Sequence, residues 1–230
     1  MIQLDNVTKK FGEKVAVDGL SFEIQRGEVF GLLGKNGAGK TTTIKMLTLQ
    51  LKPTAGEISF GTASELEIKS QIGIVPQHLN FDQDLTVWEN LELHARLYHL
   101  PPSERKLRIS ELLRFVELEP VRNSFIKNLS GGMKRRLLIV RALIHEPQIL
   151  FLDEPTVALD PQVRRKIWEL VQQLKSRGIT IVLTTHYIEE AEFLCDRVAI
   201  LSAGKLVALD STQNLCAGKS LEEVFIALTK

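Results

Sequence analysis

The chain alternates short apolar runs with longer stretches whose apolar residues recur every three or four positions. Val29–Leu33, Gln148–Leu152, Thr180–Thr184 and Arg197–Leu201 have the length and apolar character of buried strands. Between them, stretches such as Thr41–Leu51 have the spacing of helices that cover a sheet. Because this alternation is typical of a mostly parallel sheet flanked by helices, the pattern predicts an α/β fold.

The first residues follow a different pattern. Short apolar segments at Ile2–Leu4, Val15–Val17 and Leu20–Ile24 are interrupted by turn sequence around Gly12 and followed by a turn at Gly27. Strands joined by such short turns pair antiparallel. We therefore expect a small antiparallel β layer to precede the main sheet.

Helical signals replace strand signals between residues 81 and 146. Thr86 and Glu89 form a capping box before an amphipathic stretch. A second helix follows the break at Pro101, and a third begins at Ser130. Strand alternation resumes afterwards, so residues 81–146 are predicted to be an inserted helical subdomain.

The division of the chain follows from this insertion. We expect one domain over the whole chain, in which residues 1–80 and 147–210 form an α/β core with the antiparallel layer. Within that core, Asp160 and Pro161 supply the N-cap and first-turn proline of a helix. Residues 211–230 are predicted to hold a C-terminal helix, capped by Ser220-Leu-Glu-Glu223.

The composition is that of a globular protein. Of the 230 residues, 44% are hydrophobic and 25% are charged, which suffices for an ordinary core without disulfides. The formal net charge of +1 offers no general attraction for nucleic acid or anionic lipid. Basic residues predominate locally in Ser103–Arg141, which is either a solvated helical face or a docking surface.

The sequence shows no targeting or metal-cluster signal. Cys195 and Cys216 lack the spacing of metal ligands, and the five histidines are scattered. The opening Met-Ile-Gln-Leu-Asp has no basic segment followed by an apolar stretch, and no run of about 18 apolar residues occurs. We expect two reduced thiols and a chain that is neither secreted nor membrane-spanning.

The strongest chemical signal is Gly34-Lys-Asn-Gly-Ala-Gly-Lys40-Thr41, which stands between a predicted buried strand and a helix. Glycines let main-chain N–H groups converge on phosphate oxygens, and the N-terminus of the following helix adds partial positive charge. In this P-loop pattern Lys40 would bridge the β- and γ-phosphates, and the Thr41 hydroxyl would coordinate Mg²⁺. A glycine-rich turn with a surface lysine is the alternative, and it leaves the flanking strand and helix unexplained. The predicted nucleotide-binding residues are Gly34, Asn36, Gly37, Ala38, Gly39, Lys40, Thr41 and Thr42.

Asp153 and Glu154 follow a buried apolar strand, at the edge where α/β sheets bind ligands. Asp153 fits the magnesium carboxylate of P-loop proteins, and Glu154 could polarise the attacking water. Taken alone, the two carboxylates could instead cap the loop at Pro155. Beside a P-loop, they predict a hydrolytic site.

Three further motifs carry little information singly. Ser130-Gly-Gly-Met133 is either an anion-binding helix start or an ordinary N-cap. Gln77 after a strand, and His186 after two threonines, have the character of ordinary loop residues.

The order of these motifs is more specific than any one of them. From the P-loop through Gln77, Leu129-Ser-Gly-Gly-Met133, Asp153-Glu154, Ala158-Leu-Asp160 and His186, the chain resembles the ATP-binding subunit of ABC transporters over essentially its whole length. Stretches such as Asp84-Leu-Thr-Val-Trp-Glu-Asn90 are similar to the exporter-type (ABC-2-like) branch. The resemblance implies an α/β P-loop NTPase (RecA-like) core with an N-terminal antiparallel β layer and an inserted helical subdomain.

The resemblance also implies roles for single residues. Phe11, where the family usually has tyrosine, would stack on the adenine. Gln77 would sense Mg²⁺ and the attacking water, and His186 would hold the γ-phosphate. The implied catalytic set is Glu154, His186, Gln77 and Lys40, and the implied metal set is Thr41, Gln77 and Asp153.

The resemblance further implies a second copy. Ser130, Gly131 and Gly132 would contact the γ-phosphate of ATP bound to another ATPase subunit, in a head-to-tail homodimer or heterodimer with two ATP molecules. Asp160 would lie at that interface. Met133 and Ala158 stand where the family often has glutamine and glycine, and these departures concern the geometry of the interface.

The implied function is hydrolysis of ATP, with Mg²⁺, to power transport through separately encoded transmembrane permease subunits, in the export direction. The helical subdomain would receive the permease, and the chain would be cytoplasmic, peripheral on the inner face of the cell membrane. No nucleic-acid partner is expected. The alternative is a soluble ABC-type ATPase that acts as a scaffold or assembly factor. A small-molecule kinase would need an acceptor site that the sequence does not display.

Overall fold

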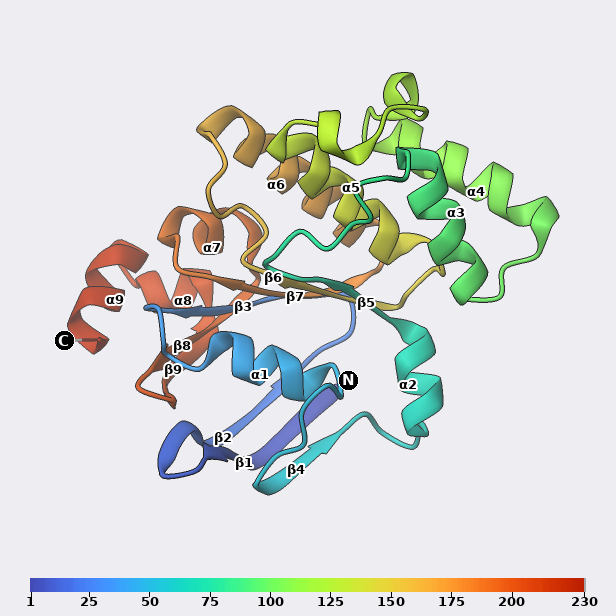
Figure 1. Cartoon of the computed structure of the whole chain (residues 1–230). Coiled ribbons are helices and arrows are strands. Elements are labelled where there is room, and N and C mark those ends of the chain that lie inside the picture. The colour runs from blue at the N-terminus through green and yellow to red at the C-terminus, as the bar shows by residue number, and fades with distance from the viewer. Residues whose placement is uncertain (230) are drawn as a thin grey trace.

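The computed structural model describes residues 1–229, which form two β-sheets with helices on both faces of the larger one (Figure 1). In this part of the chain the larger sheet has six strands in the order β5-β6-β7-β3-β8-β9. They are β3 (Val29–Gly34), β5 (Ile72–Val75), β6 (Ile149–Asp153), β7 (Thr180–Thr185), β8 (Arg197–Ser202) and β9 (Lys205–Ser211). Neighbouring strands are parallel except for β8 and β9. The prediction of a mostly parallel sheet is confirmed.

Side chains of the central strand β3 alternate between two hydrophobic cores. Val29 and Leu33 belong to one core, and Phe30 and Leu32 belong to the other. All four side chains are fully buried. A parallel sheet that is covered on both faces needs apolar residues at successive positions, which explains the uninterrupted apolar run of this strand.

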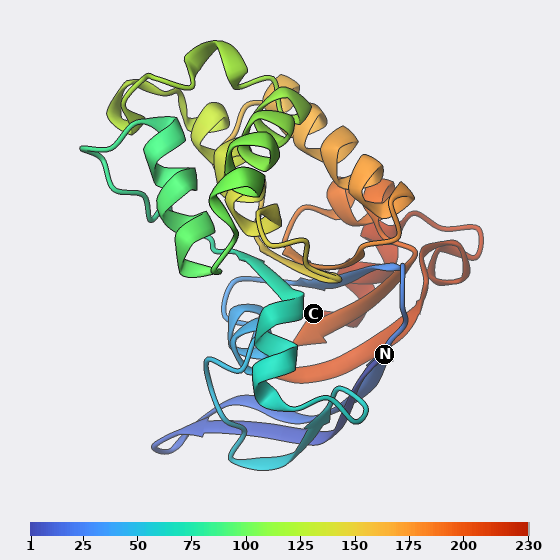
Figure 2. The same cartoon turned by 90° about the vertical axis from the view of Figure 1, so that its right-hand side faces the viewer.

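The two cores lie on opposite faces of the larger sheet. Helices of the middle and late chain cover one face, and the first helix and the smaller sheet cover the other (Figure 1). Figure 2, turned by 90°, keeps these layers on opposite sides. The covering helices are α1 (Lys40–Leu47) on one face, and α5 (Gly131–Leu143), α6 (Pro161–Ser176) and α7 (Ile188–Leu194) on the other.

The smaller sheet has the order β2-β1-β4, and both of its strand pairs are antiparallel. Its strands are β1 (Ile2–Phe11), β2 (Lys14–Ile24) and β4 (Ala55–Ser59). The predicted antiparallel layer is therefore present, with longer strands than the apolar segments suggested. Strand β4 was not predicted, because its residues are exposed or half-buried and carry no apolar run.

The segment between β5 and β6 is built of helices. It contains α3 (Val87–Leu97), α4 (Pro102–Phe115), two short 3₁₀ helices (Glu119–Val121 and Ile126–Asn128) and α5. The hydroxyl of Thr86 accepts a hydrogen bond from the backbone N–H of Glu89, whose side chain accepts in return from the N–H of Thr86. The predicted capping box thus begins α3. We propose that residues 81–146 are the helical subdomain.

Several short elements were not predicted. Helix α2 (Glu65–Gln71) begins at a capping box formed by Ser64 and Glu67, a signal that was present in the sequence and overlooked. Strand β9 and helix α7 were also missed. Each of these elements is short, so its apolar periodicity is weak.

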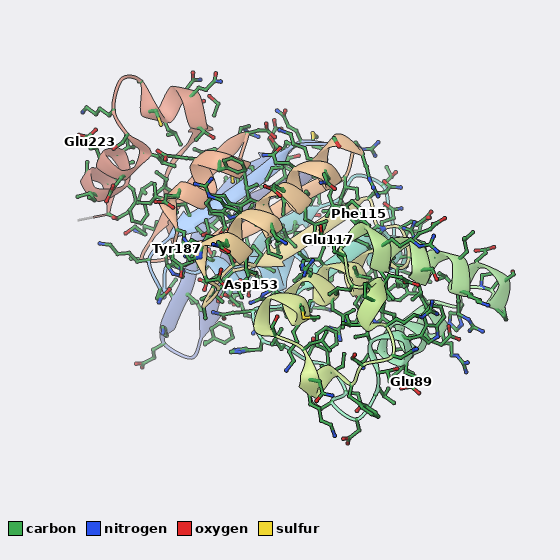
Figure 3. The ribbon with its side chains drawn as sticks, turned by 90° about the horizontal axis from the view of Figure 1, so that it is seen from above. Glu89, Phe115, Glu117, Asp153, Tyr187 and Glu223 are labelled. Carbon is green, nitrogen blue, oxygen red and sulfur yellow. The ribbon has the colours of Figure 1, made fainter. Side chains whose placement is uncertain are left out.

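Two helices, where one was predicted, lie in residues 211–229. This segment contains α8 (Thr212–Cys216) and α9 (Leu221–Leu228). The chain turns between them at Ala217 and Gly218, where φ is +26° and +89°. Such values do not occur inside a right-handed helix, so the segment divides there. The capped helix predicted at Ser220 is α9, and Figure 3 shows Glu223 of this helix far from Glu89 of α3.

Candidate functional site

The loop between β3 and α1 depends on its glycines. Gly39 has φ of +100°, and a Cβ atom there would lie 2.7 Å from the carbonyl oxygen of Ala16. At Gly34 a Cβ atom would lie 2.7 Å from the carbonyl oxygen of Leu201. Both obstacles are backbone atoms and cannot rotate away. The loop therefore packs against neighbouring main chain in a way that residues with side chains could not.

Lys40 begins α1, and its side chain turns back over the loop. Its ammonium group donates to the carbonyl oxygens of Gly34 at 2.8 Å and Lys35 at 3.2 Å. Only 5% of the residue is exposed. Oε1 of Glu154 lies 3.4 Å from the same nitrogen. The charge of Lys40 is therefore held at one place, beside the amides of the loop.

Asp153, at the end of β6, lies between α1 and β7. Its Oδ1 accepts hydrogen bonds from the hydroxyls of Thr41 at 3.2 Å and Thr184 at 2.6 Å. The Thr184 hydroxyl in turn accepts from the backbone N–H of Glu154 at 2.9 Å. Thr184 is not among the predicted site residues. Its position at the carboxyl end of β7, next to β6, brings it to the two carboxylates.

The Glu154 carboxylate is the meeting point of four segments that are distant in sequence. Besides Lys40, the side-chain amide of Gln77 donates to its Oε2 at 3.0 Å, and Nδ1 of His186 lies 3.4 Å from its Oε1. The residue is buried and has φ of +47°, in the sparsely populated left-handed region. Such strain persists only where the surroundings hold it, and it is concentrated at functional sites.

Arg135 of α5 holds the loop that carries Gln77. Its guanidinium donates to the carbonyl oxygens of Pro76 at 2.8 Å and Gln77 at 3.0 Å, and only 4% of the residue is exposed. Burial lowers the pKa of Arg135, while the carboxylates of Asp153, Glu190 and Glu154 act in the opposite direction. This positioning contact was not predicted, because a single arginine in a basic helix gives no sequence signal.

A cavity of about 320 Å³ opens beside these residues. Of the predicted site residues, Asn36, Gly37, Gly39, Lys40, Thr41, Thr42, Gln77 and Glu154 line it. Lys14, Val15 and Ala16 of β2 also line it and were not predicted. Gly34 and Asp153 do not line the cavity but accept hydrogen bonds from two residues that do, Lys40 and Thr41 respectively. Ala38 is buried in the loop. His186 does not line the cavity either, but its ring contacts Glu154, which does.

The remaining predicted residues lie outside this cavity. Phe11 is half exposed at the end of β1, with the Lys9 ammonium 5.5 Å from its ring centre. The Ser130 hydroxyl caps α5 by accepting from the N–H of Met133 at 3.3 Å. Asp160 caps α6, accepting from the N–H groups of Gln162 at 3.1 Å and Val163 at 3.0 Å.

The starts of α5 and α6 are close neighbours. A Cβ atom built on Gly132 would lie 2.5 Å from Cγ1 of Val163. Ser130, Gly131 and Asp160 are exposed around this contact. The structure therefore gathers the Ser-Gly-Gly motif and Asp160 on one surface, and does not bring them to the cavity of the same chain.

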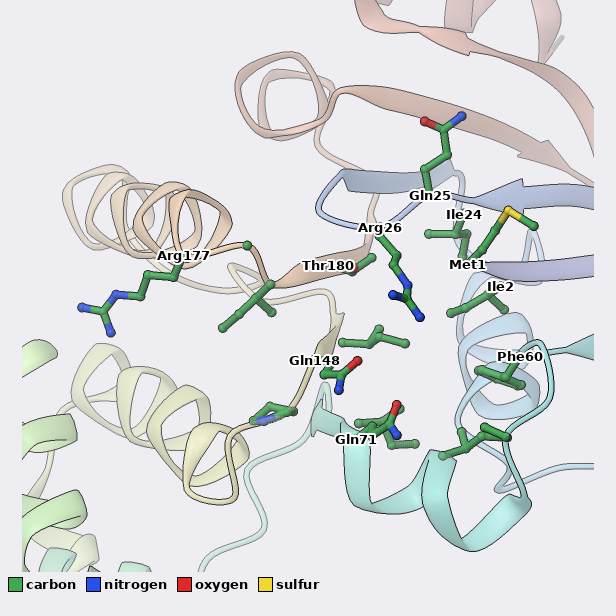
Figure 4. Close-up of a pocket in the computed structure, with 17 residues that line it drawn as sticks. Met1, Ile2, Ile24, Gln25, Arg26, Phe60, Gln71, Gln148, Arg177 and Thr180 are labelled. Atoms are coloured by element: carbon green, nitrogen blue, oxygen red, sulfur yellow. The ribbon is translucent and has the colours of Figure 1, made fainter.

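A larger cavity, of about 390 Å³, lies away from these residues (Figure 4). It is lined by residues at the starts of β1, β5, β6 and β7, including Ile2, Ile72, Ile149 and Thr180. In Figure 4 the side chain of Arg26 extends into it, whereas that of Arg177 points away. It contains none of the predicted site residues.

Comparison with known proteins shows the family of the chain. The family described as "ABC transporter" matches residues 17–157, which is more than half of the chain. The chain belongs to the ABC transporter family. A second family, described as "AAA domain, putative AbiEii toxin, Type IV TA system", matches the shorter range 125–190.

Relatives of this ABC transporter domain cover most of its length. The linearmycin resistance ATP-binding protein LnrL of Bacillus subtilis is 43% identical over 221 residues, which are 94% of this chain and 71% of the relative. The Nod factor export ATP-binding protein I of Burkholderia lata is 46% identical over 211 residues, which are 90% of this chain and 69% of the relative. The resemblance inferred from the order of the motifs is confirmed.

Solved structures agree in fold. An ATP-binding subunit of an ABC transporter superposes with a TM-score of 0.89 at 31% identity and covers all of both chains. The ATP-binding cassette MJ0796, in a dimeric post-hydrolysis state bound to ADP and Pi, gives a TM-score of 0.82 at 34% identity and covers 92% of this chain and 98% of that one. The predicted P-loop NTPase fold is confirmed.

As a member of this family, the chain is the ATP-binding and ATP-hydrolysing component of a transporter. Over residues 1–229, none of the helices combines the length and the apolar character that crossing a bilayer requires.

Proposed function

We propose that this chain is the ATPase subunit of an exporter and works as a dimer on separately encoded transmembrane subunits. Export is supported by relatives named for linearmycin resistance and Nod factor export, which match at least 90% of the chain. Dimerisation is supported by the dimeric MJ0796 cassette. A permease partner is supported by cbiO1 of Clostridium perfringens, described as part of the cbiONQ complex, which superposes with a TM-score of 0.85 at 27% identity.

The P-loop cavity has the chemistry of a triphosphate site. Its wall combines glycine backbone with the buried ammonium of Lys40, and α1 points its N-terminus at the same loop. In our proposal the loop amides bind phosphate oxygens and Lys40 bridges the β- and γ-phosphates. Gly34, Gly37 and Gly39 allow the approach, and Asn36, Ala38, Thr41 and Thr42 complete the loop.

The oxygen atoms beside this loop fit magnesium. The Thr41 hydroxyl and the Asp153 carboxylate lie 3.2 Å apart, and both are hard oxygen ligands of the kind Mg²⁺ prefers. Across the described residues no group of three or more His, Cys, Asp and Glu side chains is placed to hold a metal by itself. Thr41, Asp153 and the amide oxygen of Gln77 would therefore hold Mg²⁺ together with phosphate oxygens. The ion would neutralise negative charge on the phosphates.

Glu154 carries the hydrolytic part of the proposal. Its carboxylate, in contact with Lys40, Gln77 and His186, is the single observation on which the mechanism rests. In this position it accepts the proton of the attacking water, which Gln77 orients, while His186 holds the γ-phosphate. The buried setting strengthens each of these polar contacts.

The exposed surface at the starts of α5 and α6 would serve a second subunit. Ser130, Gly131 and Gly132 would bind the γ-phosphate of ATP held by the partner, and Asp160 would lie at the interface. We propose a homodimer or a heterodimer of such subunits. Phe11 pairs with Lys14, which lines the cavity, and its side chain is half exposed. This position supports stacking of the ring on the adenine.

The helical subdomain, residues 81–146, would receive the permease. The chain would then be held at the inner face of the cell membrane by this partner. Co-expression with a membrane protein encoded beside this chain, followed by purification from detergent-solubilised membranes, tests this part of the proposal. Recovery of the ATPase only from the membrane-free fraction would contradict it.

The experiment that tests the mechanism is the Glu154→Gln substitution. The amide keeps the size and most contacts of the side chain but cannot accept the proton. We expect ATP turnover to fall by at least about a hundredfold, as typical for loss of a general base, with ATP affinity nearly unchanged and an ATP-dependent dimer on sizing chromatography.

The matched control is Glu189→Gln, at an exposed position on α7. It removes the same charge and should retain wild-type turnover. Wild-type turnover by Glu154→Gln would reject Glu154 as the general base.

A further inference from the structure

Glu190 is a buried carboxyl beside the hydrolytic site. It lies on α7, four residues after His186, and none of its surface is exposed. Its Oε1 accepts two hydrogen bonds, from the hydroxyl of Thr156 at 2.7 Å and from the indole N–H of Trp168 at 2.9 Å. One oxygen atom therefore joins three segments of the chain.

Thr156 connects this carboxyl to the proposed general base. It follows Glu154 by two residues, in the segment that links β6 to α6 and ends at Asp160, and it is fully buried. Within the segment, Glu154 and Ala158 have φ of +47° and +59°. A chain with two strained residues does not keep its shape by local preference alone. The hydrogen bond from Thr156 to Glu190 anchors it from outside.

Trp168 connects the same carboxyl to the body of the protein. Its ring stacks on Phe193 of α7, with ring centres 5.1 Å apart. The rest of α6 packs through its apolar face into the core. Trp168 thus holds α6 against α7 by packing as well as by its hydrogen bond. It belongs to neither of the loops that carry Glu154 and His186.

Burying the Glu190 carboxyl at this position costs free energy. Burial raises the pKa of Glu190, and the nearby polar groups of Thr185, Thr156 and Trp168 together with the charge of Arg164 only oppose this effect. Its second oxygen, Oε2, is buried without a hydrogen-bond partner among the described residues. An apolar residue would fill the same space without these costs. Stability alone therefore does not account for the group.

We propose that Glu190 is a positioning residue for ATP hydrolysis, which sets the distance between Glu154 and His186 through its hydrogen bond to Thr156. The carboxyl stands on the helix that follows the His186 loop and binds the loop that carries Glu154. Movement of either loop then changes the position of both groups around the γ-phosphate. The inference rests on the roles proposed for Glu154 and His186.

Two matched variants test it on the full-length chain. Thr156→Val and Trp168→Phe each remove one hydrogen-bond donor to the same Oε1. Valine keeps the shape of threonine, and phenylalanine keeps an aromatic ring but is smaller than tryptophan. Both should lower the denaturant midpoint of unfolding. Thr156→Val alone should lower kcat, by about tenfold, because small misplacements of catalytic groups cost that much or more. The KM for ATP should change by less than about twofold, since the P-loop is untouched.

Conservative replacement of the carboxyl supplies the second readout. Glu190→Gln retains an oxygen that accepts from Thr156 and Trp168, so kcat should stay within about twofold of wild type. Glu190→Leu removes the acceptor and should lower kcat as Thr156→Val does. In the Glu190→Leu background, Thr156→Val should have no further effect on kcat. If the leucine variant does not fold, the comparison of Thr156→Val with Trp168→Phe decides.

The outcomes separate this inference from the mechanism on which it rests. If Glu154→Gln is inactive but Thr156→Val and Trp168→Phe have the same kcat, the positioning role of Glu190 is wrong and the general base stands. A rise in KM without loss of kcat in Thr156→Val would also overturn it. If Glu154→Gln turns over ATP at the wild-type rate, the mechanism itself fails.

Discussion

The Lys40 ammonium lies 3.4 Å from the Glu154 carboxylate, and the two side chains are 5% and 8% exposed. Lys40 is also the residue that would bind the β- and γ-phosphates. The cation that binds the phosphates and the carboxylate that would activate water are therefore in contact within one buried site. Their closeness depends on the sheet, because β3 precedes Lys40, β6 precedes Glu154, and β7 lies between these two strands.

Replacing Lys40 by alanine should weaken ATP binding. Loss of charge-assisted hydrogen bonds to phosphate should reduce the affinity for ATP by about 10- to 100-fold, or about 1.5–3 kcal/mol. Isothermal titration calorimetry measures this affinity. The control is Lys45→Ala, which removes an exposed lysine from the same helix and should leave the affinity unchanged. Equal ATP affinity in Lys40→Ala and wild type would exclude the phosphate-binding role.

The same substitution should lower stability without nucleotide. Glu154 would stay buried after losing its lysine partner, and breaking a buried ion pair typically costs about 3–5 kcal/mol of the free energy of unfolding. The hydrogen bond from Gln77 to Glu154 offsets part of this loss. Urea unfolding of the lysine variants in nucleotide-free buffer measures the difference. A Lys40→Ala variant as stable as Lys45→Ala would show that the pair contributes little.

The packing of α5 against α6 depends on Gly132. In Gly132→Ala the new Cβ atom would lie 2.5 Å from Cγ1 of Val163, so the helices must separate or the valine must leave its rotamer. We expect the free energy of unfolding to fall by about 1–3 kcal/mol, as in other overpacked sites. Helix propensity acts the other way, by about 0.5–1 kcal/mol.

The double variant Gly132→Ala with Val163→Ala makes room for the added methyl group. It should recover part of the stability that Gly132→Ala loses, and urea unfolding measures both. If Gly132→Ala is as stable as wild type and the double variant is less stable, the close packing at this position does not limit stability.

His94 should make stability depend on pH. Burial lowers the pKa of His94 to about 4, and the charges of Arg141 and His145 act in the same direction. Below the pKa of about 6.5 that histidine has in an unfolded chain, the unfolded state binds more protons than the folded state. The free energy of unfolding should therefore fall as the pH decreases from about 6.5 to 4. Because the side chain is only partly buried, we expect a loss of about 1–2 kcal/mol.

The measurement is denaturant unfolding at pH 7 and pH 5. His94→Gln should lose less stability over this interval than wild type, whereas His78→Gln, at an exposed position, should behave as wild type does. The stability of His94→Gln should still depend on pH to some extent, because burial also lowers the pKa of His145. If His94→Gln loses as much stability as wild type between pH 7 and pH 5, the prediction is contradicted.

Local signals in the sequence predicted the elements that local interactions determine. The capping boxes at Thr86 and Ser220, and the N-cap at Asp160, form hydrogen bonds within three residues, so the sequence contains both partners. The P-loop is likewise recognisable, because glycine spacing, the preceding strand and the following helix are contiguous. Short elements such as β4 and α8 escaped prediction, because their conformation depends on what they pack against.

The sequence by itself therefore determined the fold class, the family and the candidate residues of the nucleotide site. Only the tertiary structure brought Gln77, Lys40 and His186 to Glu154, and only it showed the anchors at Arg135, Thr184 and Glu190. These contacts join segments that are far apart in sequence and depend on strand order and register. A single sequence does not encode such pairings locally, because their energy arises only when the sheet has formed.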